Sequence, residues 1–294
     1  MTEHLQERAR QALELTEAER IQHIRSDRWI GYSRASDLLK KLEDLLHHPK
    51  THRMPNMVIV GETNNGKTKI VNEFRLRHPP SDNRTIDAIS APVLVVQAPS
   101  NPTETRFYGE ILHTLYAPMR PSSNAEQRLL QVLTLFKAIG IRVLVIDEIH
   151  HIIAGSLQRQ RVFLNTIKYL GNELQIPIVG VGTSDALHAL QSDPQLANRF
   201  EPVLLPRWKF DEEFLRLLAS FEAMLPLRER SDLVETTLAA TILGKSEGTI
   251  GEIATLLTRA AVLAVETKRE RIDAKLIEKV DYVTPSQRKR RHAG

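Results

Sequence analysis

The sequence predicts an α/β fold of three layers, a parallel five-stranded sheet with helices on both faces, followed by a small all-helical domain. Runs of β-branched residues alternate with helical stretches. A strand is predicted for each run, at residues 56–60, 93–97, 142–146, 177–181 and, more weakly, 202–205. Apolar strands that alternate with helices are typical of a parallel sheet buried on both faces. Beyond residue 206 the apolar spacing is helical and no strand pattern remains, which predicts the second domain.

The change of pattern at residues 206–210 is one of three boundaries that we expect. The predicted segments are an N-terminal helical extension (1–28), an α/β domain (29–208), a helical lid domain (209–285) and a basic tail (286–294). The periodicity predicts helices over residues 1–27, 37–48, 211–225, 232–243, 249–266 and 273–280. The tail holds four consecutive basic residues from Arg288, which favours a solvated, disordered segment; the alternative is an arm that touches nucleic acid.

Composition narrows the class of protein. Of 294 residues, 41% are hydrophobic, enough for a sizeable core, and lysine and arginine exceed the acids by four (40 − 36). That mild excess permits a polyanionic partner without requiring one. The chain has no cysteine, which excludes disulfides and thiolate zinc sites. The charged N-terminus does not match a signal peptide, and no apolar run approaches the roughly 18 residues of a membrane span, so we expect a cytoplasmic protein without membrane contact.

A phosphate-binding loop follows the first predicted strand. Residues 61–68 read GETNNGKT, which matches the pattern GxxxxGK[ST] between a strand and a helix. Glycines let successive backbone N–H groups point at phosphate oxygens, and the start of a helix adds its positive dipole end. We expect Lys67 to neutralise the β- and γ-phosphates of ATP and the Thr68 hydroxyl to bind Mg²⁺. The nucleotide-binding residues are predicted to be Gly61, Glu62, Thr63, Asn64, Asn65, Gly66, Lys67, Thr68 and Lys69.

Two acids end the third predicted strand. The apolar run 143–146 is followed by Asp147 and Glu148. We expect Asp147 to hold Mg²⁺ and Glu148 to polarise the water that attacks the γ-phosphate. A solvated acidic turn explains the pair equally well when it is taken alone, but the phosphate loop makes the catalytic interpretation the better one. The predicted activity is hydrolysis of ATP to ADP and phosphate.

Two histidines, His150 and His151, follow the acids directly. Neighbouring histidines on one strand or helix are not expected to converge on one ion, so the sequence favours one packed and one exposed side chain instead of a metal site.

The chain resembles the AAA+ ATPases, and within them the TniB/TnsC-type regulators of transposition. The resemblance spans most of residues 29–208. It rests on the segments WIGYSRASDLL, GETNNGKT, LVIDEIHHIIAGS, LNTIKYLGNELQIPIVGVGTSDA and LANRFEPVLLPRW. The phosphate and acid motifs are common to many ATPases, whereas the third and fourth segments are more particular to TniB-like proteins. The implied fold is the P-loop AAA+ fold with a helical lid.

The resemblance implies further site residues. Thr183 falls at the family's sensor position near the γ-phosphate, and Arg199 at the position of an arginine finger that reaches a neighbouring subunit. Trp29, Ile30 and Tyr32 fall near the adenine-binding segment. The sequence leaves alternatives open, because Arg199 could form a surface ion pair and the apolar residues could be a core staple.

One departure from the family concerns the lid. Many AAA+ proteins place a second sensor arginine there, whereas residues 248–252 read GTIGE, without arginine. This departure argues against fast, nucleotide-gated lid closure and leads us to expect slow turnover.

The resemblance implies a regulator that oligomerises with ATP on double-stranded DNA as a ring or helical filament. It would recruit or activate a separate DDE transposase and be recruited by a target-selection protein. DNA contact would be sequence-nonspecific and would follow the phosphate backbone. By charge alone the candidates for that contact are Arg106, Arg159, Arg161 and Lys168, although solvated helix faces explain each one singly.

Three alternatives remain. A helicase loader or replication initiator would have the same fold but would act in DNA replication instead of transposition. A P-loop kinase for a small molecule would need an acceptor pocket and lid arginines in one subunit. A nucleotide-dependent switch would bind ATP and barely hydrolyse it.

Overall fold

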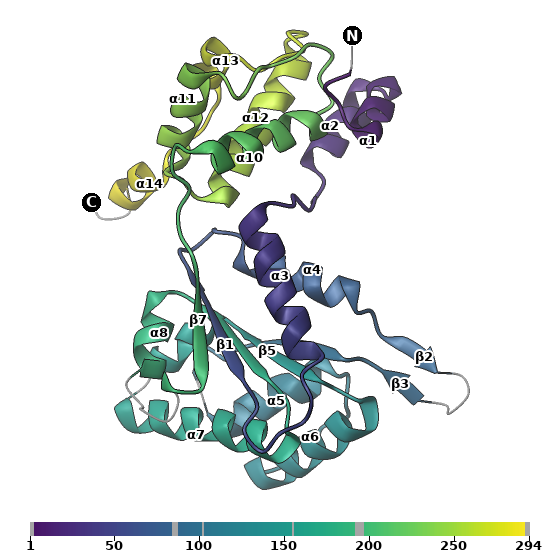
Figure 1. Ribbon diagram of the computed structural model, residues 1–294, viewed down its shortest axis with the longest axis vertical. Helices are drawn as coiled ribbons and strands as arrows, with labels where there is room; N and C mark the ends of the chain where they lie inside the picture. The colour runs from purple at the N-terminus through teal and green to yellow at the C-terminus, as the bar shows by residue number, and fades with distance from the viewer. Residues whose placement is uncertain (1–2, 84–87, 102, 155, 192–196, 292–294) are drawn as a thin grey trace. The chain divides into compact units, whose positions relative to one another are not determined.

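The computed structural model describes residues 3–83, 88–101, 103–154, 156–191 and 197–291 (Figure 1). Contacts divide the chain into two compact units. The helical unit comprises Met1–Ser33, Asn64–Gly66 and Pro206–Gly294, and the sheet unit comprises Arg34–Thr63 and Lys67–Leu205. The division into four segments, 1–28, 29–208, 209–285 and 286–294, stays a proposal.

The sheet unit is built on five parallel strands, as the sequence predicts. They are β1 (Asn56–Gly61), β4 (Val93–Gln97), β5 (Val143–Asp147), β6 (Ile178–Gly182) and β7 (Phe200–Leu205), in the spatial order β4-β5-β6-β1-β7. Every residue of β5 and β6 is buried, which explains their continuous apolar sequences. The edge strand β7 is largely exposed and contains Pro202, which an edge tolerates, so its sequence pattern is weaker.

Helices cover both faces of this sheet (Figure 1). They are α3 (Ser33–Leu46), α4 (Lys67–Arg77), α5 (Glu104–Thr114), α6 (Ala125–Ile139), α7 (Leu157–Leu174) and α8 (Ser184–Gln191). A 3-10 helix, η2 (Ile149–Ala154), follows β5. Local signals set their ends: Asn124 and Gln127 form a capping box at the start of α6, and Gly140 ends that helix at a φ of 73°.

An antiparallel pair of short strands, β2 (Ser81–Asn83) and β3 (Ala88–Ser90), was not expected from the sequence. Each strand has three residues, and β2 consists of serine, aspartate and asparagine. These residues carry little β-propensity and no apolar alternation, so the sequence gives no strand signal there.

The helical unit packs around α12 (Ile250–Glu266), in which nine residues are buried. Its other helices are α1 (Glu7–Gln11), η1 (Ala12–Glu14), α2 (Glu17–Arg25), α10 (Glu212–Met224), α11 (Thr236–Ser246), α13 (Ala274–Lys279) and α14 (Pro285–Arg291). The buried Arg20 of α2 donates to both carboxylate oxygens of Glu270, at 3.0 and 2.5 Å. Two parallel bonds of this kind hold α2 firmly to the chain after α12.

Helix bounds differ from the sequence predictions in places. The helix predicted over residues 37–48 begins earlier, at Ser33. The helix predicted over 232–243 begins at Thr236 instead, because the Glu235 side chain accepts the N–H groups of Thr237 and Leu238 and so caps the helix there. Thr16 and Glu19 form a capping box that starts α2 and breaks the N-terminal helical stretch.

The C-terminal basic segment corrects an expectation. Its charge favours disorder, yet residues 285–291 form α14, and Arg288 on this helix pairs with the buried Glu252. A buried carboxylate needs a cationic or hydrogen-bonding partner. The number of charges in the tail alone does not show that one of them, Arg288, serves as this partner.

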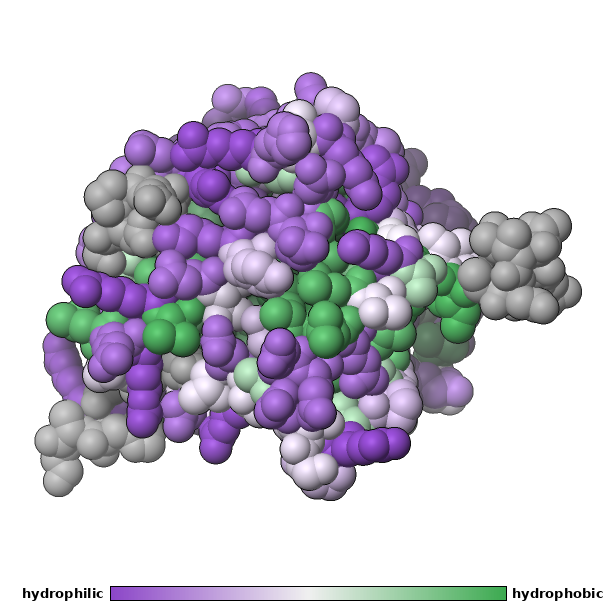
Figure 2. Space-filling model, turned by 90° about the horizontal axis from the view of Figure 1, so that it is seen from below, coloured by the Kyte–Doolittle hydropathy of each residue, from purple (hydrophilic) through white to green (hydrophobic). Residues whose placement is uncertain are grey.

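One face of the molecule is drawn by residue hydropathy in Figure 2. Figure 2 shows hydrophilic residues over most of the face seen from below, with a group of hydrophobic residues near its middle. Large apolar side chains that are exposed in the sheet unit include Tyr116, Leu130, Leu157 and Tyr169. Within the described residues no single helix is long and apolar enough to cross a membrane; α11 and α12 meet that test only together, as a pair bent by 117°.

Candidate functional site

The phosphate loop lies where the sequence places it, between β1 and α4. Lys67 is the first residue of α4 and is 8% exposed. Its ammonium donates to the carbonyl oxygens of Gly61, at 2.9 Å, and Glu62, at 2.8 Å. These bonds fold the lysine back along its own loop. Glu62 and Thr63 are exposed, and Lys69, one turn into α4, is half-buried.

Burial and charge act on Lys67 in opposite directions. Burial lowers the pKa of Lys67, while the carboxylates of Glu148, Asp147 and Glu62 act to raise it. The net pKa is lower than that of a free lysine. Three acids thus lie near enough to influence a partly desolvated cation, and perturbed groups of this kind are common at functional sites.

The two predicted magnesium ligands meet. Thr68 Oγ1 donates to Asp147 Oδ2 at 2.7 Å, although 79 residues separate them in the chain. The other carboxylate oxygen of Asp147 accepts the backbone N–H of Glu148 at 2.8 Å, which orients the carboxylate. Hydroxyl and carboxylate oxygens are the ligands that Mg²⁺ prefers, so this donor set fits the ion that the sequence implies.

The acids lead into a cluster that the sequence did not predict. Glu148 takes a left-handed φ of 53°, and the chain then turns into η2. This turn brings His150 Nε2 to 3.1 Å from Glu148 Oε2, while His151 Nδ1 lies 3.0 Å from the carbonyl oxygen of Ala98. One ligand atom from each of Glu148, His150 and His151 lies within 4.8 Å of the others, close enough to share a metal ion. The expectation that these histidines do not converge is wrong, and both are half-buried.

The middle of the loop, Asn64–Gly66, belongs to the helical unit. Asn64 and Gly66 have φ values of 61° and 80°, the left-handed conformation that asparagine and glycine adopt most readily. The N-terminus of α12 contacts this segment: the N–H of Gly251 donates to the Asn64 carbonyl oxygen at 3.0 Å, and that of Ile250 to Asn65 Oδ1 at 3.4 Å. The loop therefore caps two N–H groups that the helix cannot satisfy itself.

Ile30 and Tyr32 also lie in the helical unit, half-buried against its core. Tyr32 packs edge-on against Trp208 with ring centroids 5.1 Å apart, and its hydroxyl lies 3.9 Å from the point where a Cβ on Gly66 would sit. Tyr32 is therefore both a core residue and a neighbour of the loop. This packing agrees with the core-staple interpretation, while adenine binding by Ile30 and Tyr32 stays a prediction.

Thr183 follows β6 directly, at the same edge of the sheet as the acids after β5. Its Oγ1 atom is buried, and the described residues offer it no hydrogen-bond partner. A buried hydroxyl without a protein partner costs free energy unless a water or a ligand satisfies it, so this atom is open to either.

Arg199 lies away from these residues within the sheet unit. It directly precedes β7, and its carbonyl oxygen accepts the N–H of Asn56, the first residue of β1. The phosphate loop leaves the other end of β1, six residues later. At about 3.3 Å per residue the two ends are separated by roughly 17 Å. Arg199 Nη1 donates to Asn172 Oδ1 at 2.8 Å, so among the described residues its side chain bonds an amide and not the acid expected of a surface ion pair.

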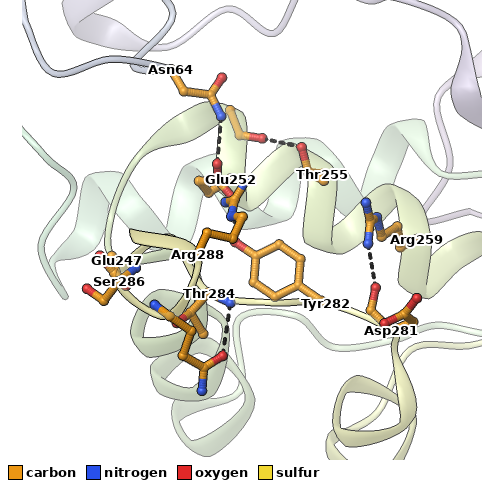
Figure 3. Close-up of polar contacts among 12 residues, drawn as sticks. Asn64, Glu247, Glu252, Thr255, Arg259, Asp281, Tyr282, Thr284, Ser286 and Arg288 are labelled. Atoms are coloured by element: carbon orange, nitrogen blue, oxygen red, sulfur yellow. Dashed lines mark hydrogen bonds and ion pairs between the residues drawn. The ribbon is translucent and has the colours of Figure 1, made fainter. Parts of the chain in front are cut away.

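Sequence reasoning missed three residues beside the loop: Glu252, Tyr282 and Arg288. Asn64 Nδ2 donates to Glu252 Oε1 at 2.9 Å, and Glu252 Oε2 accepts from Tyr282 and Arg288 (Figure 3). The stretch GTIGE itself contains no arginine, but the fold brings one there from 36 residues further along the chain. No sequence spacing predicts that Arg288 pairs with Glu252. The one available signal was an acid, Glu252, next to Gly251 at the start of a predicted helix.

Comparisons with known proteins support the fold. A family model described as "Bacterial TniB protein" matches residues 20–210. No curated protein matches the chain. Three similar solved structures are an Aeropyrum pernix ORC2 protein in ADPNP–ADP complexes, an Aeropyrum pernix ORC1 protein in complex with DNA, and a Drosophila ORC bound to DNA.

The ORC2 structure is 17% identical, with a TM-score of 0.64, and covers 88% of this chain and 70% of that one. The ORC1 structure is 16% identical, with a TM-score of 0.63, and covers 88% and 68%. The Drosophila structure is 15% identical, with a TM-score of 0.60, and covers 94% and 66%. At these identities the likeness concerns the fold, which is that of the AAA+ ATPases.

Proposed function

Because the chain belongs to the TniB family of bacterial proteins, we propose that it is an ATP-hydrolysing AAA+ protein that regulates DNA transposition. The observation that carries the nucleotide part is the hydrogen bond between Thr68 and Asp147, beside the buried ammonium of Lys67. A hydroxyl and a carboxylate that face each other next to a lysine-bearing loop suit a magnesium–triphosphate pair.

In this proposal the loop 61–68 binds the triphosphate through its backbone N–H groups and Lys67. Thr68 and Asp147 would hold Mg²⁺, whose charge would screen the phosphate oxygens. To contact the phosphates, the ammonium of Lys67 must either break its hydrogen bonds to the carbonyl oxygens of Gly61 and Glu62 or bond to carbonyl and phosphate oxygens at the same time. Thr183 supplies its unpartnered hydroxyl to the γ-phosphate or to the attacking water.

Glu148 orients the attacking water. Its contact with His150 Nε2 holds the carboxylate at a defined place, 3.1 Å from the ring nitrogen. A water positioned by this carboxylate attacks the γ-phosphorus in line with the leaving oxygen. The protein contributes mainly by positioning the reactants and by stabilising charge.

Arg199 acts between subunits. It lies at the opposite end of β1 from the phosphate loop of its own sheet unit, roughly 17 Å away by strand length. An arginine that stabilises the transferred phosphoryl group must contact it directly, so Arg199 serves a neighbouring subunit. Hydrolysis then requires a homo-oligomer, either a ring or a helical filament.

Double-stranded DNA is the proposed template for this oligomer. Support comes from the family, from the excess of four basic residues, and from the DNA-bound ORC structures with the same fold. Contacts to the phosphate backbone give binding that reads little sequence and falls steeply with salt. A DDE transposase and a target-selection protein are the proposed protein partners.

A second candidate is a helicase loader or replication initiator, because the DNA-bound structures that share the fold are origin-recognition proteins. The two tasks differ in the partner. Stimulation of strand transfer by a cognate transposase supports the regulator, whereas loading of a helicase onto DNA supports the alternative. A small-molecule kinase is a third class, which release of free phosphate without an acceptor excludes.

Electron microscopy tests the proposal most directly. The full chain is mixed with duplex DNA and a non-hydrolysable ATP analogue, with ADP and no nucleotide as matched controls. We expect rings or helical coats around DNA with the analogue alone. Dispersed monomers under all three conditions would contradict the regulator, and assemblies that form equally without nucleotide would contradict the role of ATP.

A further inference from the structure

The phosphate loop is anchored by a buried carboxylate outside the nucleotide motifs. Glu252, in the first turn of α12, is 6% exposed. Its Oε1 accepts the side-chain amide of Asn64 at 2.9 Å, and its Oε2 accepts the hydroxyl of Tyr282 at 2.6 Å and Nη2 of Arg288 (Figure 3). Both oxygens are therefore used, one for the loop and one for the C-terminal segment.

A second bond fixes the backbone of the loop. The N–H of Gly251 donates to the carbonyl oxygen of Asn64 at 3.0 Å. In a trans peptide the N–H points opposite to the C=O, so this bond directs the N–H of Asn65 away from α12. That N–H is one of those that the motif uses to bind phosphate. The start of α12 thus sets the direction of a phosphate-binding donor.

The contact depends on glycine at position 251. A Cβ there would lie 2.0 Å from Asn64 Oδ1 and 2.7 Å from its carbonyl oxygen, so any side chain would push the loop away. Asn64 itself sits at a φ of 61°, which few residues other than asparagine and glycine adopt at low cost. Gly251 and Asn64 therefore both permit the loop and the helix to approach closely.

We propose that Glu252 is a positioning residue of the nucleotide site, held by Arg288 and Tyr282 of the C-terminal segment, which tunes nucleotide affinity through Asn64. This inference rests on the proposed nucleotide-binding function. In this proposal the segment 282–288 regulates the loop. When the contact between Arg288 and Glu252 is lost, the carboxylate stays charged but has one hydrogen-bond donor fewer. It then holds Asn64 less firmly.

A double-mutant cycle tests the route. Dissociation constants for MgATP are measured by calorimetry for the full wild-type chain, Glu252→Ala, Asn64→Gly and the double variant, and thermal unfolding of each is recorded without nucleotide. Asn64→Gly permits the left-handed φ and removes the side-chain amide. We expect each single variant to weaken binding at least about tenfold, and the double variant to be no weaker than the weaker single one.

Matched controls separate positioning from stability. Glu278→Ala removes an exposed acid that pairs with Lys245 in the same unit, and should leave MgATP affinity unchanged. Arg288→Ala should weaken binding, whereas Arg290→Ala removes the same charge from an exposed site on α14 and should not. Glu252→Gln, which keeps an oxygen for Asn64, should bind MgATP more tightly than Glu252→Ala.

The outcomes distinguish this inference from the proposed function. If the wild type binds no MgATP, the proposed function fails and this inference with it. If the wild type binds and Glu252→Ala or Asn64→Gly binds equally well or better, this inference alone is wrong. Additive effects in the double variant would also overturn it, because Glu252 would then act by a route other than Asn64. If Glu252→Ala does not fold, the MgATP affinities of Asn64→Gly and Arg288→Ala decide whether the inference holds.

Discussion

At the scale of single residues, the nucleotide chemistry depends on where a few polar atoms are held. The carboxylate of Asp147 is oriented by the N–H of Glu148 and faces Thr68, and Lys67 is desolvated beside three acids. Each atom has a structural partner that a ligand could replace. Under the proposed function, Thr68 and Asp147 are already oriented before nucleotide binds, whereas Lys67 must exchange its carbonyl partners for phosphate oxygens.

Replacing Glu148 by glutamine should separate binding from hydrolysis. The amide keeps the size of the side chain but cannot polarise water, so we expect phosphate release to fall about 10²–10⁴-fold while MgATP affinity changes little. Phosphate-release assays and calorimetry on the same preparation check this. Turnover that persists in Glu148→Gln would show that another group orients the water.

At the scale of elements, strands were easier to predict than contacts between helices. Buried β-branched runs gave β5 and β6 nearly to the residue, and the loop motif located the start of α4. The pair β2–β3 escaped prediction because polar three-residue strands carry no pattern.

The candidate site was predictable to the same extent. Lys67 and Thr68 lie in a strand–loop–helix motif, and Asp147 ends a buried apolar strand, so the sequence alone located these residues. Arg288 and Glu252 meet only because α14 returns to the start of α12. A side chain supplied by tertiary packing leaves no local signal in the sequence. The histidines beside Glu148 escaped prediction for a different reason: the left-handed φ of Glu148 and the 3-10 helix η2 after it form a local turn that the sequence did not indicate.

The tie between α12 and α14 should depend on pH. Burial acts to raise the pKa of Glu252, but hydrogen bonds from Tyr282, Asn64 and Arg288 outweigh it, and the pKa is lower than its ordinary value of 4.5. Burial and the neighbouring Glu252 raise the pKa of Tyr282, so the tyrosine keeps its proton and donates. The unfolded chain then binds protons more readily than the folded one.

We therefore expect Glu252 to stabilise the protein fully above about pH 4.5 and to lose this contribution as pH falls through its lowered folded pKa. The measurement is the free energy of unfolding of wild type and Glu252→Gln by urea titration between about pH 6 and pH 3. The advantage of wild type should shrink as pH falls. A difference that stays constant over this range would mean that the carboxylate does not titrate as described.

At the scale of the whole molecule, activity should require neighbouring copies. Arg199 lies at the far end of β1 from the loop of its own sheet unit. We expect Arg199→Ala to bind MgATP normally and to lose turnover about 10³–10⁵-fold, the usual contribution of an arginine finger. Mixed with Glu148→Gln, it should regain partial activity, because some interfaces then combine an intact arginine with an intact glutamate. No recovery in the mixture would place Arg199 outside the neighbouring site.

Calorimetric titration of MgATP into the full-length folded chain, with Lys67→Ala as the control, tests the central claim most directly. We expect a saturable heat of binding for the wild type and a loss of at least about 100-fold in affinity for the variant, since the variant lacks the ammonium that neutralises the phosphates. A folded wild-type chain that gives no heat, or a Lys67→Ala chain that binds as tightly as the wild type, would contradict a nucleotide site at this loop.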